Sequence, residues 1–343
     1  MSIAYVGLDL AKNVFQVHCS DNNGRVLLRK RLPRLQLLEF FANLPACTVA
    51  MEACATAHYW GRKFERFGHA IRLIAPQFVK PFVKSNKNDS ADAEAICEAV
   101  QRPTMRFVPL KSVEQQAILA IHRARDGFVK ARTAQANQLR GLLAEFGVTI
   151  PVTIRALYKG VVEAIARESD DLPVTMKELC QALLQRLREI DEQISALEVT
   201  IVRWHRQSEL SKMLETIPGI GPISATAIVG NIGDGRCFKN GRQFAAWLGL
   251  VPRQYSSGGA ERLLGISKRG DAYLRRLLVH GARVLVRWAI NRGKPEAWLT
   301  KVTLRRNPNI AAIAMANKNA RIAWALLHHA QKFERNHVVA TAS

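Results

Sequence analysis

The fold of the first third of the chain is decided by the stretch YVGLDLAK, residues 5–12. Its short apolar run leads directly into Asp9, and Asp is seldom buried without a partner. We therefore predict a buried strand that ends near Asp9 and presents this carboxylate at the edge of a sheet.

Strand and helix signals alternate outward from this stretch over residues 1–109. The other candidate strands are NVFQVHCS, RVLLRKRL, CTVAME and AIRLIA, at residues 13–20, 25–32, 47–52 and 70–75. Residues 21–24, Asp-Asn-Asn-Gly, form a tight turn between the first two of these, and helical stretches separate the later ones. The order βββαβαβα predicts a ribonuclease-H-like mixed sheet, and so an α/β domain.

Three more acids accompany this pattern. Glu52 ends the strand CTVAME, and Asp89 and Asp92 lie three residues apart at a helix start, on one face. One interpretation makes Asp89 a helix N-cap and Asp92 an ordinary first-turn acid. The other brings all four acids together, where their repulsion requires cations. Carboxylate oxygens are ligands for Mg²⁺, so this interpretation predicts metal-dependent phosphodiester chemistry.

Residues 110–207 are predicted to be an all-helical domain. One long helix covers about 112–146 and a second about 177–205. Apolar residues of the second helix repeat every three and four positions in a heptad seam; they are Leu183, Leu187, Ile190, Ile194, Leu197 and Ile201. The seam predicts either a coiled-coil arm that pairs subunits or a helical hairpin with the first helix of the same chain.

The composition points to nucleic acid. The chain of 343 residues has a net charge of +22, of which +16 falls in residues 201–343, and 48% hydrophobic residues indicate a folded protein. We find no apolar run long enough to cross a membrane and no secretory signal, so we expect a cytoplasmic protein. The six cysteines form no C-x-x-C pair, and we expect buried thiols rather than disulfides or a zinc site.

A glycine-rich turn opens the predicted C-terminal helical domain, residues 208–343. TIPGIGPISATAIVGNIG, residues 216–233, has the form of a helix-hairpin-helix, in which Gly219 and Gly221 would bring backbone N–H groups to phosphates. The alternative is a tight helix–helix turn that has a packing role only.

A serine-glycine loop, Tyr255-Ser256-Ser257-Gly258-Gly259, follows among the cations Arg253, Arg262, Lys268 and Arg269. A serine here could attack phosphorus, Tyr255 is a rival nucleophile, and the alternative is that the serines only bind phosphate. The next predicted helix would carry a phosphate-tracking stripe of Arg275, Arg276, Arg283 and Arg287. We expect Trp247, Trp288, Trp298 and Trp324 in the core.

Several of these motifs together carry a resemblance over nearly the whole chain. They are YVGLDLAK, VAMEACATAHYW, NKNDSADAEAICEA, IPGIGPISA, FKNGRQFAAWLGLVPRQYSSGG, LLGISKRGDAYLRRLLVHGAR and KNARIAWALL. The sequence resembles transposases of the insertion sequence 110 family, described as RNA-guided recombinases, and within it the 1111 subgroup.

The resemblance implies a RuvC-like domain whose Asp9, Glu52, Asp89 and Asp92 bind Mg²⁺, and a C-terminal domain in which Ser257 is the nucleophile, with Ser256 the alternative register. It also implies a phosphoserine intermediate, a structured bridge RNA that pairs with double-stranded donor and target DNA, and homodimers that join into a tetramer.

One departure from the family pattern follows the second acid. Many relatives have Gly shortly after it, whereas this chain has Ala55, where a positive φ would be strained. Two other functions stay open from the residues alone. One is a RuvC-like junction nuclease that uses metal-bound water; the other is a non-catalytic nucleic-acid-binding protein.

Overall fold

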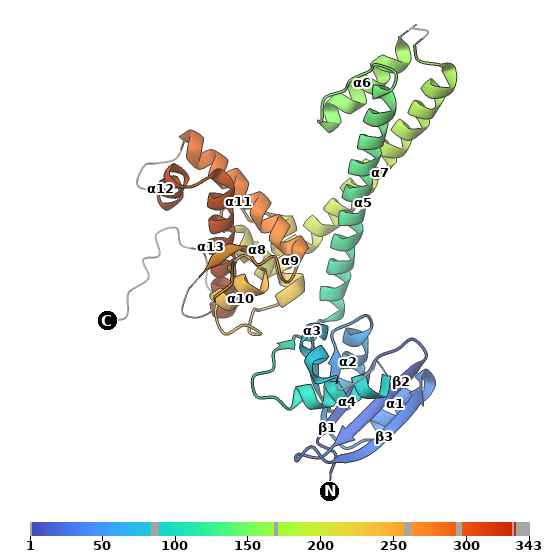
Figure 1. The fold of residues 1–343 in the computed structure, drawn as a ribbon, viewed down its shortest axis with the longest axis vertical. Helices are drawn as coiled ribbons and strands as arrows, with labels where there is room; N and C mark the ends of the chain where they lie inside the picture. Colours follow the sequence, from blue (N-terminus) through green and yellow to red (C-terminus); the bar gives the residue numbers. More distant parts are fainter. Residues whose placement is uncertain are drawn as a thin grey trace. The chain divides into compact units, whose positions relative to one another are not determined.

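The computed structural model describes residues 2–83, 89–167, 171–256, 262–292, 297–330 and 333, with Asp89 and Ser90 described by their backbone only. The chain forms two compact units, Met1–Val113 and Glu114–Ser343. Figure 1 shows the first unit in blue to cyan and the second in green to red.

Six strands of the described residues form one mixed sheet in the first unit, in the order β3-β2-β1-β4-β5-β6. They are β1 Tyr5–Asp9, β2 Val14–Ser20, β3 Val26–Pro33, β4 Thr48–Glu52, β5 Ala70–Ile74 and β6 Phe107–Val108. The first three pair antiparallel, β1, β4 and β5 pair parallel, and β6 is antiparallel to β5. The predicted mixed sheet is confirmed, and this arrangement is consistent with a ribonuclease-H-like domain.

Side chains from both faces of this sheet are buried. On one face Val49 and Met51 of β4 join a core that includes α1 (Leu37–Ala42) and α2 (Ala57–Glu65). On the other face Ala50 joins α3 (Pro76–Val79) and α4 (Asp89–Val100). Successive residues of a strand point to opposite faces, so one short apolar run serves two cores.

The second unit begins with a long helical hairpin, α5 (Val113–Ala144) and α7 (Val174–Gln207), with α6 (Ile154–Ala166) packed near its far end (Figure 1). Arg125 of α5 pairs with Glu198 of α7, and Arg132 pairs with Asp191. These pairs are seven residues apart on both helices and run in opposite directions, so the hairpin is antiparallel and in constant register.

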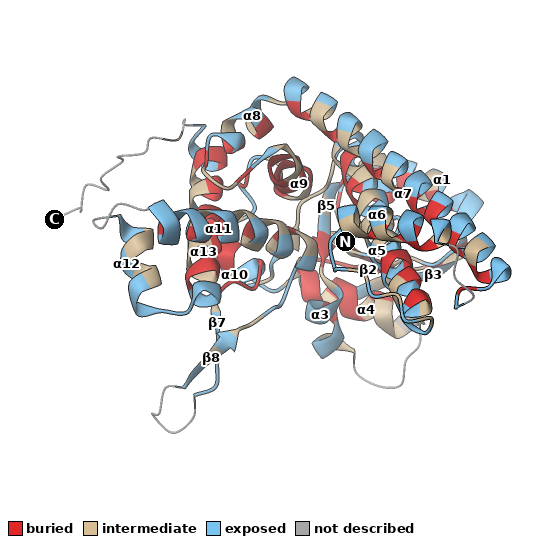
Figure 2. Ribbon diagram, turned by 90° about the horizontal axis from the view of Figure 1, so that it is seen from above, coloured by how far each residue is buried: buried red, intermediate tan, exposed pale blue. Residues whose placement is uncertain are grey.

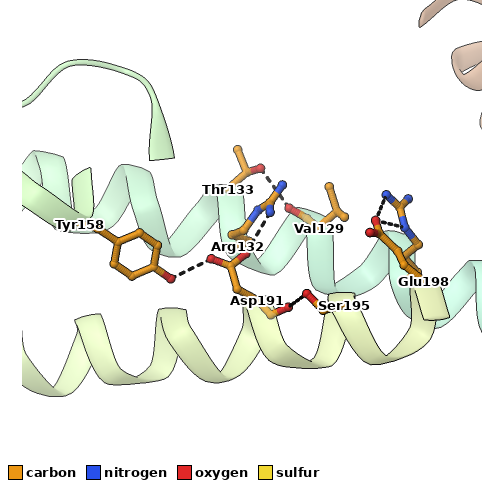
Figure 3. A network of polar contacts seen from close by, with 8 residues as sticks. Val129, Arg132, Thr133, Tyr158, Asp191, Ser195 and Glu198 are labelled. Carbon is orange, nitrogen blue, oxygen red and sulfur yellow. Dashed lines mark hydrogen bonds and ion pairs between the residues drawn. The ribbon is translucent and has the colours of Figure 1, made fainter. Parts of the chain in front are cut away.

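The heptad seam of α7 faces the inside of this hairpin. Leu187, Ile190, Ile194 and Ile201 are all buried. A shared carboxylate fixes α6 beside it, because Asp191 accepts hydrogen bonds from Tyr158 at 2.7 Å and from Arg132 at 2.9 Å (Figure 3). Burial, then the contact with Asp191, raises the pKa of Tyr158, which keeps its hydroxyl a donor. Of the two interpretations of the seam, the structure has the intramolecular hairpin.

The rest of the second unit packs around a buried helix. Its elements are α8 Glu209–Glu215, α9 Pro222–Ile232, α10 Gly241–Trp247, β7 Pro252–Gln254, β8 Leu263–Ile266, α11 Ala272–Arg292, α12 Trp298–Arg305 and α13 Pro308–His329. Figure 2 shows α9 red, since residues 224–230 are all buried. A helix that is apolar all round belongs in a core, which explains the absence of charge in this segment.

Two packing predictions were wrong in part. Cys54 and Cys237 are exposed, whereas the other four cysteines are buried as expected. Trp324 is 8% exposed and belongs to the core, but Trp288 is 56% exposed, Trp298 43% and Trp247 37%. No helix among the described residues is long and apolar enough to cross a membrane.

Candidate active site and nucleic-acid interface

Asp9 and Glu52 end two neighbouring parallel strands. Leu8 of β1 is in register with Met51 of β4, and each acid is the next residue on its strand. Because the carboxyl ends of parallel strands meet at one edge of a sheet, both carboxylates lie at the same edge. Both residues are half-buried, whereas Leu8 and Met51 are fully buried.

Helix α4 reaches this edge because β1 contains a glycine. A Cβ on Gly7 would lie 2.6 Å from the backbone nitrogen of Cys97 and closer still to the carbonyl oxygen of Ala93. Only glycine therefore allows the start of α4 to pack directly on β1. Asp92, half-buried, is adjacent to Ala93 in this contact, and Asp89 begins the helix.

An exposed thiol reports the electrostatics of this edge. Burial of its sulfur raises the pKa of Cys54, and the carboxylates of Glu52 and Asp9 raise it further. The thiol thus lies within the field of both acids, which favours its protonated form. Its place two residues after Glu52 was the sequence signal for this neighbour.

The expected strain after Glu52 falls one residue later than predicted. The positive φ belongs to Thr56, at 72°, and not to Ala55. Thr56 is the residue before α2, so the strained backbone sets the turn from β4 into that helix.

The donor set at this edge suits a hard divalent cation, because Asp9, Glu52 and Asp92 offer carboxylate oxygens and β1 and β4 hold two of them side by side. Among the side chains that the structure describes, which exclude Asp89, no three acids, histidines or cysteines form a group that could hold a metal ion. Within the described side chains this edge therefore offers carboxylate oxygens but no complete group of metal ligands.

Tyr255 and Ser256, the described residues of the serine loop, follow the first strand of a β-hairpin in the second unit. β7 and β8 pair antiparallel, and the amide of Tyr255 donates to the carbonyl oxygen of Arg262 at 2.9 Å. Figure 2 shows the two strands projecting away from the helices. Tyr255 is 70% exposed and Ser256 is exposed, while Ser257 lies outside the described residues.

Two glycines join the base of this hairpin to α10. Gly249 and Gly270 have φ of +71° and +76°, and a Cβ on either would collide with the facing backbone. Arg275 lies across the same junction and donates to the carbonyl oxygens of Leu248, at 2.9 Å, and Arg269, at 3.0 Å. The guanidinium therefore ties together the chain segments that enter and leave the hairpin.

The predicted cations fall into two groups. Arg253, Arg262, Lys268 and Arg269 are exposed on or beside the hairpin. Arg275 has the carbonyl contacts just described, and Arg276 pairs with Asp126 of α5 and covers the ring of Tyr273. These last two side chains are engaged within the chain, a role that their spacing on a helix did not reveal.

The glycine-rich turn also divides. Gly219 has a φ of +85°, and a Cβ on Gly281 of α11 would collide with its carbonyl oxygen, so the turn packs backbone to backbone on α11. Asn319 donates to the Pro218 carbonyl oxygen at 2.8 Å. Gly221, by contrast, is exposed at the N-cap of α9 with open space around it. The packing interpretation accounts for Gly219, and the phosphate-binding interpretation is left with Gly221.

Two family models match the chain. A DEDD transposase model of insertion sequence 110 covers residues 6–147, and a model described as "Transposase IS116/IS110/IS902 family" covers residues 211–296. A probable family 20 transposase of Pseudomonas aeruginosa is 52% identical, over 95% of this chain and 97% of the relative. This chain belongs to the IS110 family of transposases.

Two further relatives of this transposase come from named insertion sequences. The transposase of IS1328 from Yersinia enterocolitica is 44% identical, over 97% of this chain and 99% of the relative. The transposase of IS1111A from Coxiella burnetii is also 44% identical, over 95% and 90%. The chain is thus a transposase of IS110-type insertion sequences, and it contains a DEDD domain, a type that typically depends on divalent metal.

Proposed function

We propose that this transposase is an RNA-guided DNA recombinase that cleaves and exchanges strands through a phosphoserine intermediate. The observation that carries the proposal is the placement of Asp9 and Glu52 at adjacent strand ends with α4 packed on Gly7 beside them. Acids in these positions have no role in core packing, and they suit phosphodiester chemistry.

The four acids Asp9, Glu52, Asp89 and Asp92 would hold Mg²⁺. The ion, when bound, neutralises the charge that develops on the phosphate oxygens. The chain's own contribution is to hold oxygen ligands at one sheet edge, and the glycine at position 7 supports this role for α4.

Ser257 is the proposed nucleophile. Its oxygen loses a proton and bonds to phosphorus, and the bond from phosphorus to one sugar oxygen breaks, leaving that sugar hydroxyl free. One phosphodiester replaces another, so a sugar hydroxyl of a second strand can reverse the step and no other reactant is consumed. The hairpin strands that precede and follow Ser257 are held at their base by Gly249, Gly270 and Arg275, which supports such a role because reactive groups are commonly carried by rigidly supported segments.

Several partners belong to this proposal. A structured bridge RNA pairs with double-stranded donor and target DNA, and Arg253, Arg262, Lys268, Arg269 and Gly221 contact backbone phosphates. Homodimers join into a tetramer in which the acids of one subunit meet the serine of another. The heptad seam is buried inside the chain's own hairpin, so dimer contacts use other surfaces. The limits 1–109, 110–207 and 208–343 remain proposed domain boundaries.

The test uses purified transposase with DNA of the element's ends and target and RNA transcribed from the flanking DNA. Ser257→Ala should abolish recombination and should abolish the protein–DNA adducts that survive denaturation. RNA binding should be unchanged. Ser256→Ala is the matched control and should retain adducts. Adducts that persist in Ser257→Ala contradict the assignment of this serine.

Other outcomes distinguish the remaining functions. Hydrolysed ends without any adduct in the unaltered protein would favour the junction nuclease that uses water. Binding without metal-dependent cleavage or joining for any cognate RNA and DNA would favour a non-catalytic binding protein.

A further inference from the structure

Helix α11 has one face that stays exposed among the described residues. Its opposite face is buried in the core through Leu274, Leu278, Ala282, Val286 and Ala289. The outward residues are all exposed and share one side of the helix, because positions three, four and seven apart lie together; they are His280, Arg283, Val284, Arg287, Trp288 and Asn291. We call these six residues the α11 face.

The positive charges of the α11 face are not offset by nearby acidic side chains among the described residues. Arg283 and Arg287 are four residues apart on the helix, and like charges at this spacing destabilise it. Neither has an ion pair or hydrogen bond among the described residues, in contrast to Arg276 one turn before His280. Helices α11, α12 and α13 contain no Asp or Glu. Among the described residues nothing offsets the charge of these two arginines, which leaves them available to an anionic ligand.

An exposed indole lies on the same side of α11 as the two arginines. Trp288 is 56% exposed and Val284, one turn before it, is 68% exposed. Trp is usually well buried, and an exposed aromatic ring next to cations is typical of surfaces that bind single-stranded nucleic acid, where bases stack on rings and cations contact phosphates.

A small hollow adjoins the arginines. It has a volume of about 260 Å³ and is lined by Arg283, Arg287, Asn291 and Asn309, together with apolar atoms of α11 and Pro308. This is below the usual size of a pocket for a whole cofactor or drug-sized ligand, but it accommodates a phosphate or a sugar.

We propose that the α11 face binds single-stranded nucleic acid, with Trp288 stacked on an unpaired base and Arg283 and Arg287 on neighbouring phosphates. The bases of a duplex are stacked on each other and closed to Trp288, so the indole selects a single strand over a duplex. A second copy of the chain is a poorer occupant, because a surface with no acid of its own repels its like. The inference deepens the proposed function, since strand exchange exposes unpaired nucleotides.

The test measures binding by fluorescence anisotropy, with the full chain and a labelled oligothymidylate of about 20 nucleotides, long enough to span a site of ~4–16 nucleotides. A duplex of the same length is the second probe. Trp288→Ala should weaken single-strand binding roughly 5- to 100-fold and duplex binding less than about 3-fold, because only the single strand loses stacking. Trp288→Phe should retain most of the affinity.

Substitution of Arg283 or Arg287 tests the phosphate contacts separately, through the salt dependence of binding. Arg283→Gln and Arg287→Gln should each lower the slope of log affinity against log salt by about 0.7 for a single strand. Two matched controls are Trp298→Ala, which removes an exposed indole of α12, and Arg203→Gln, which removes an exposed cation of α7; both should leave single-strand binding unchanged.

Three results would overturn the inference. They are unchanged single-strand affinity in Trp288→Ala, equal losses for both probes, and a change in oligomeric state with intact nucleic-acid affinity, which would make the face a protein interface. The assay requires no catalysis. Failure of the phosphoserine proposal would appear as missing adducts in the unaltered protein and would leave this binding difference in place.

Discussion

The two units of this transposase handle charge in opposite ways. Residues 1–100 have a net charge of only +4, and their important charges are carboxylates at the ends of strands. Residues 201–343 carry +16, and several of their cations, such as Arg253, Arg262 and Arg283, are exposed on the hairpin or on α11. The difference shows that the total charge points to nucleic acid as the partner, whereas a few carboxylates in an otherwise basic chain point to phosphodiester chemistry.

The largest expected effect tests the acids. Asp9→Asn keeps the size of the side chain and removes its charge, so activity should fall on the order of 10³-fold while nucleic-acid binding by the basic surfaces is unchanged. Recombination and binding assays on one preparation measure both. Asp21→Asn, a turn acid that caps backbone amides at 2.9 Å, is the matched control and should stay active. Full activity in Asp9→Asn would exclude this residue from the site.

The next effect tests how the acids are brought together. Gly7→Ala forces a methyl group into the backbone of α4, and should lower the free energy of unfolding of the first unit by about 3 kcal/mol. Thermal unfolding monitored by circular dichroism measures it. Gly68→Ala alters a positive-φ glycine with open space around it, so backbone strain alone should act there. A Gly7→Ala protein of unaltered stability would show that α4 does not need this close contact.

A third prediction concerns the second unit, where a histidine links α5 to α9 and α11. His122 donates from Nε2 to Thr226, whose own hydroxyl donates to Pro222, and it accepts at Nδ1 from Tyr273. Burial, then the charge of Arg125, lowers the pKa of His122 to about 4. The neutral ring is therefore the folded form.

The lowered pKa of His122 determines how the stability of the fold changes with pH. The unfolded chain binds the proton near pH 6.5, so stability is full above that pH and is lost as pH falls toward 4, by about 3 kcal/mol in total. Urea unfolding of the full chain at pH 7 and pH 4.5 should show this loss, and His122→Gln should reduce it. An equal pH dependence in both proteins would contradict it.

The smallest effect separates cations that fold the protein from those that bind. Arg275→Gln removes the bonds to Leu248 and Arg269 and should cost about 1–2 kcal/mol of stability, with an unchanged salt dependence of DNA binding. Arg253→Gln on the exposed hairpin should leave the stability unchanged and should lower the salt dependence of DNA binding. A changed slope of log DNA affinity against log salt in Arg275→Gln would show that this residue also contacts DNA.

Sequence patterns predicted the elements better than their contacts. The run from Tyr5 to Asp9 and the strand that ends at Glu52 were recognisable because burial and alternation leave a local mark. The exposed Trp288 was predicted as core because an apolar residue on a helix does not state which side its neighbours cover. Gly219 looked like a phosphate-binding residue since its partner, Gly281, is distant in sequence.

By itself the sequence determined the basic character, the order of strands and helices, and four acids of a recognisable family pattern, because these depend on local composition and spacing. Only the tertiary structure decided that the heptad seam is closed by α5, that Arg275 and Arg276 bind the chain itself, and that one face of α11 stays exposed among the described residues. These depend on which distant surfaces meet, and no local pattern encodes a contact between residues a hundred positions apart.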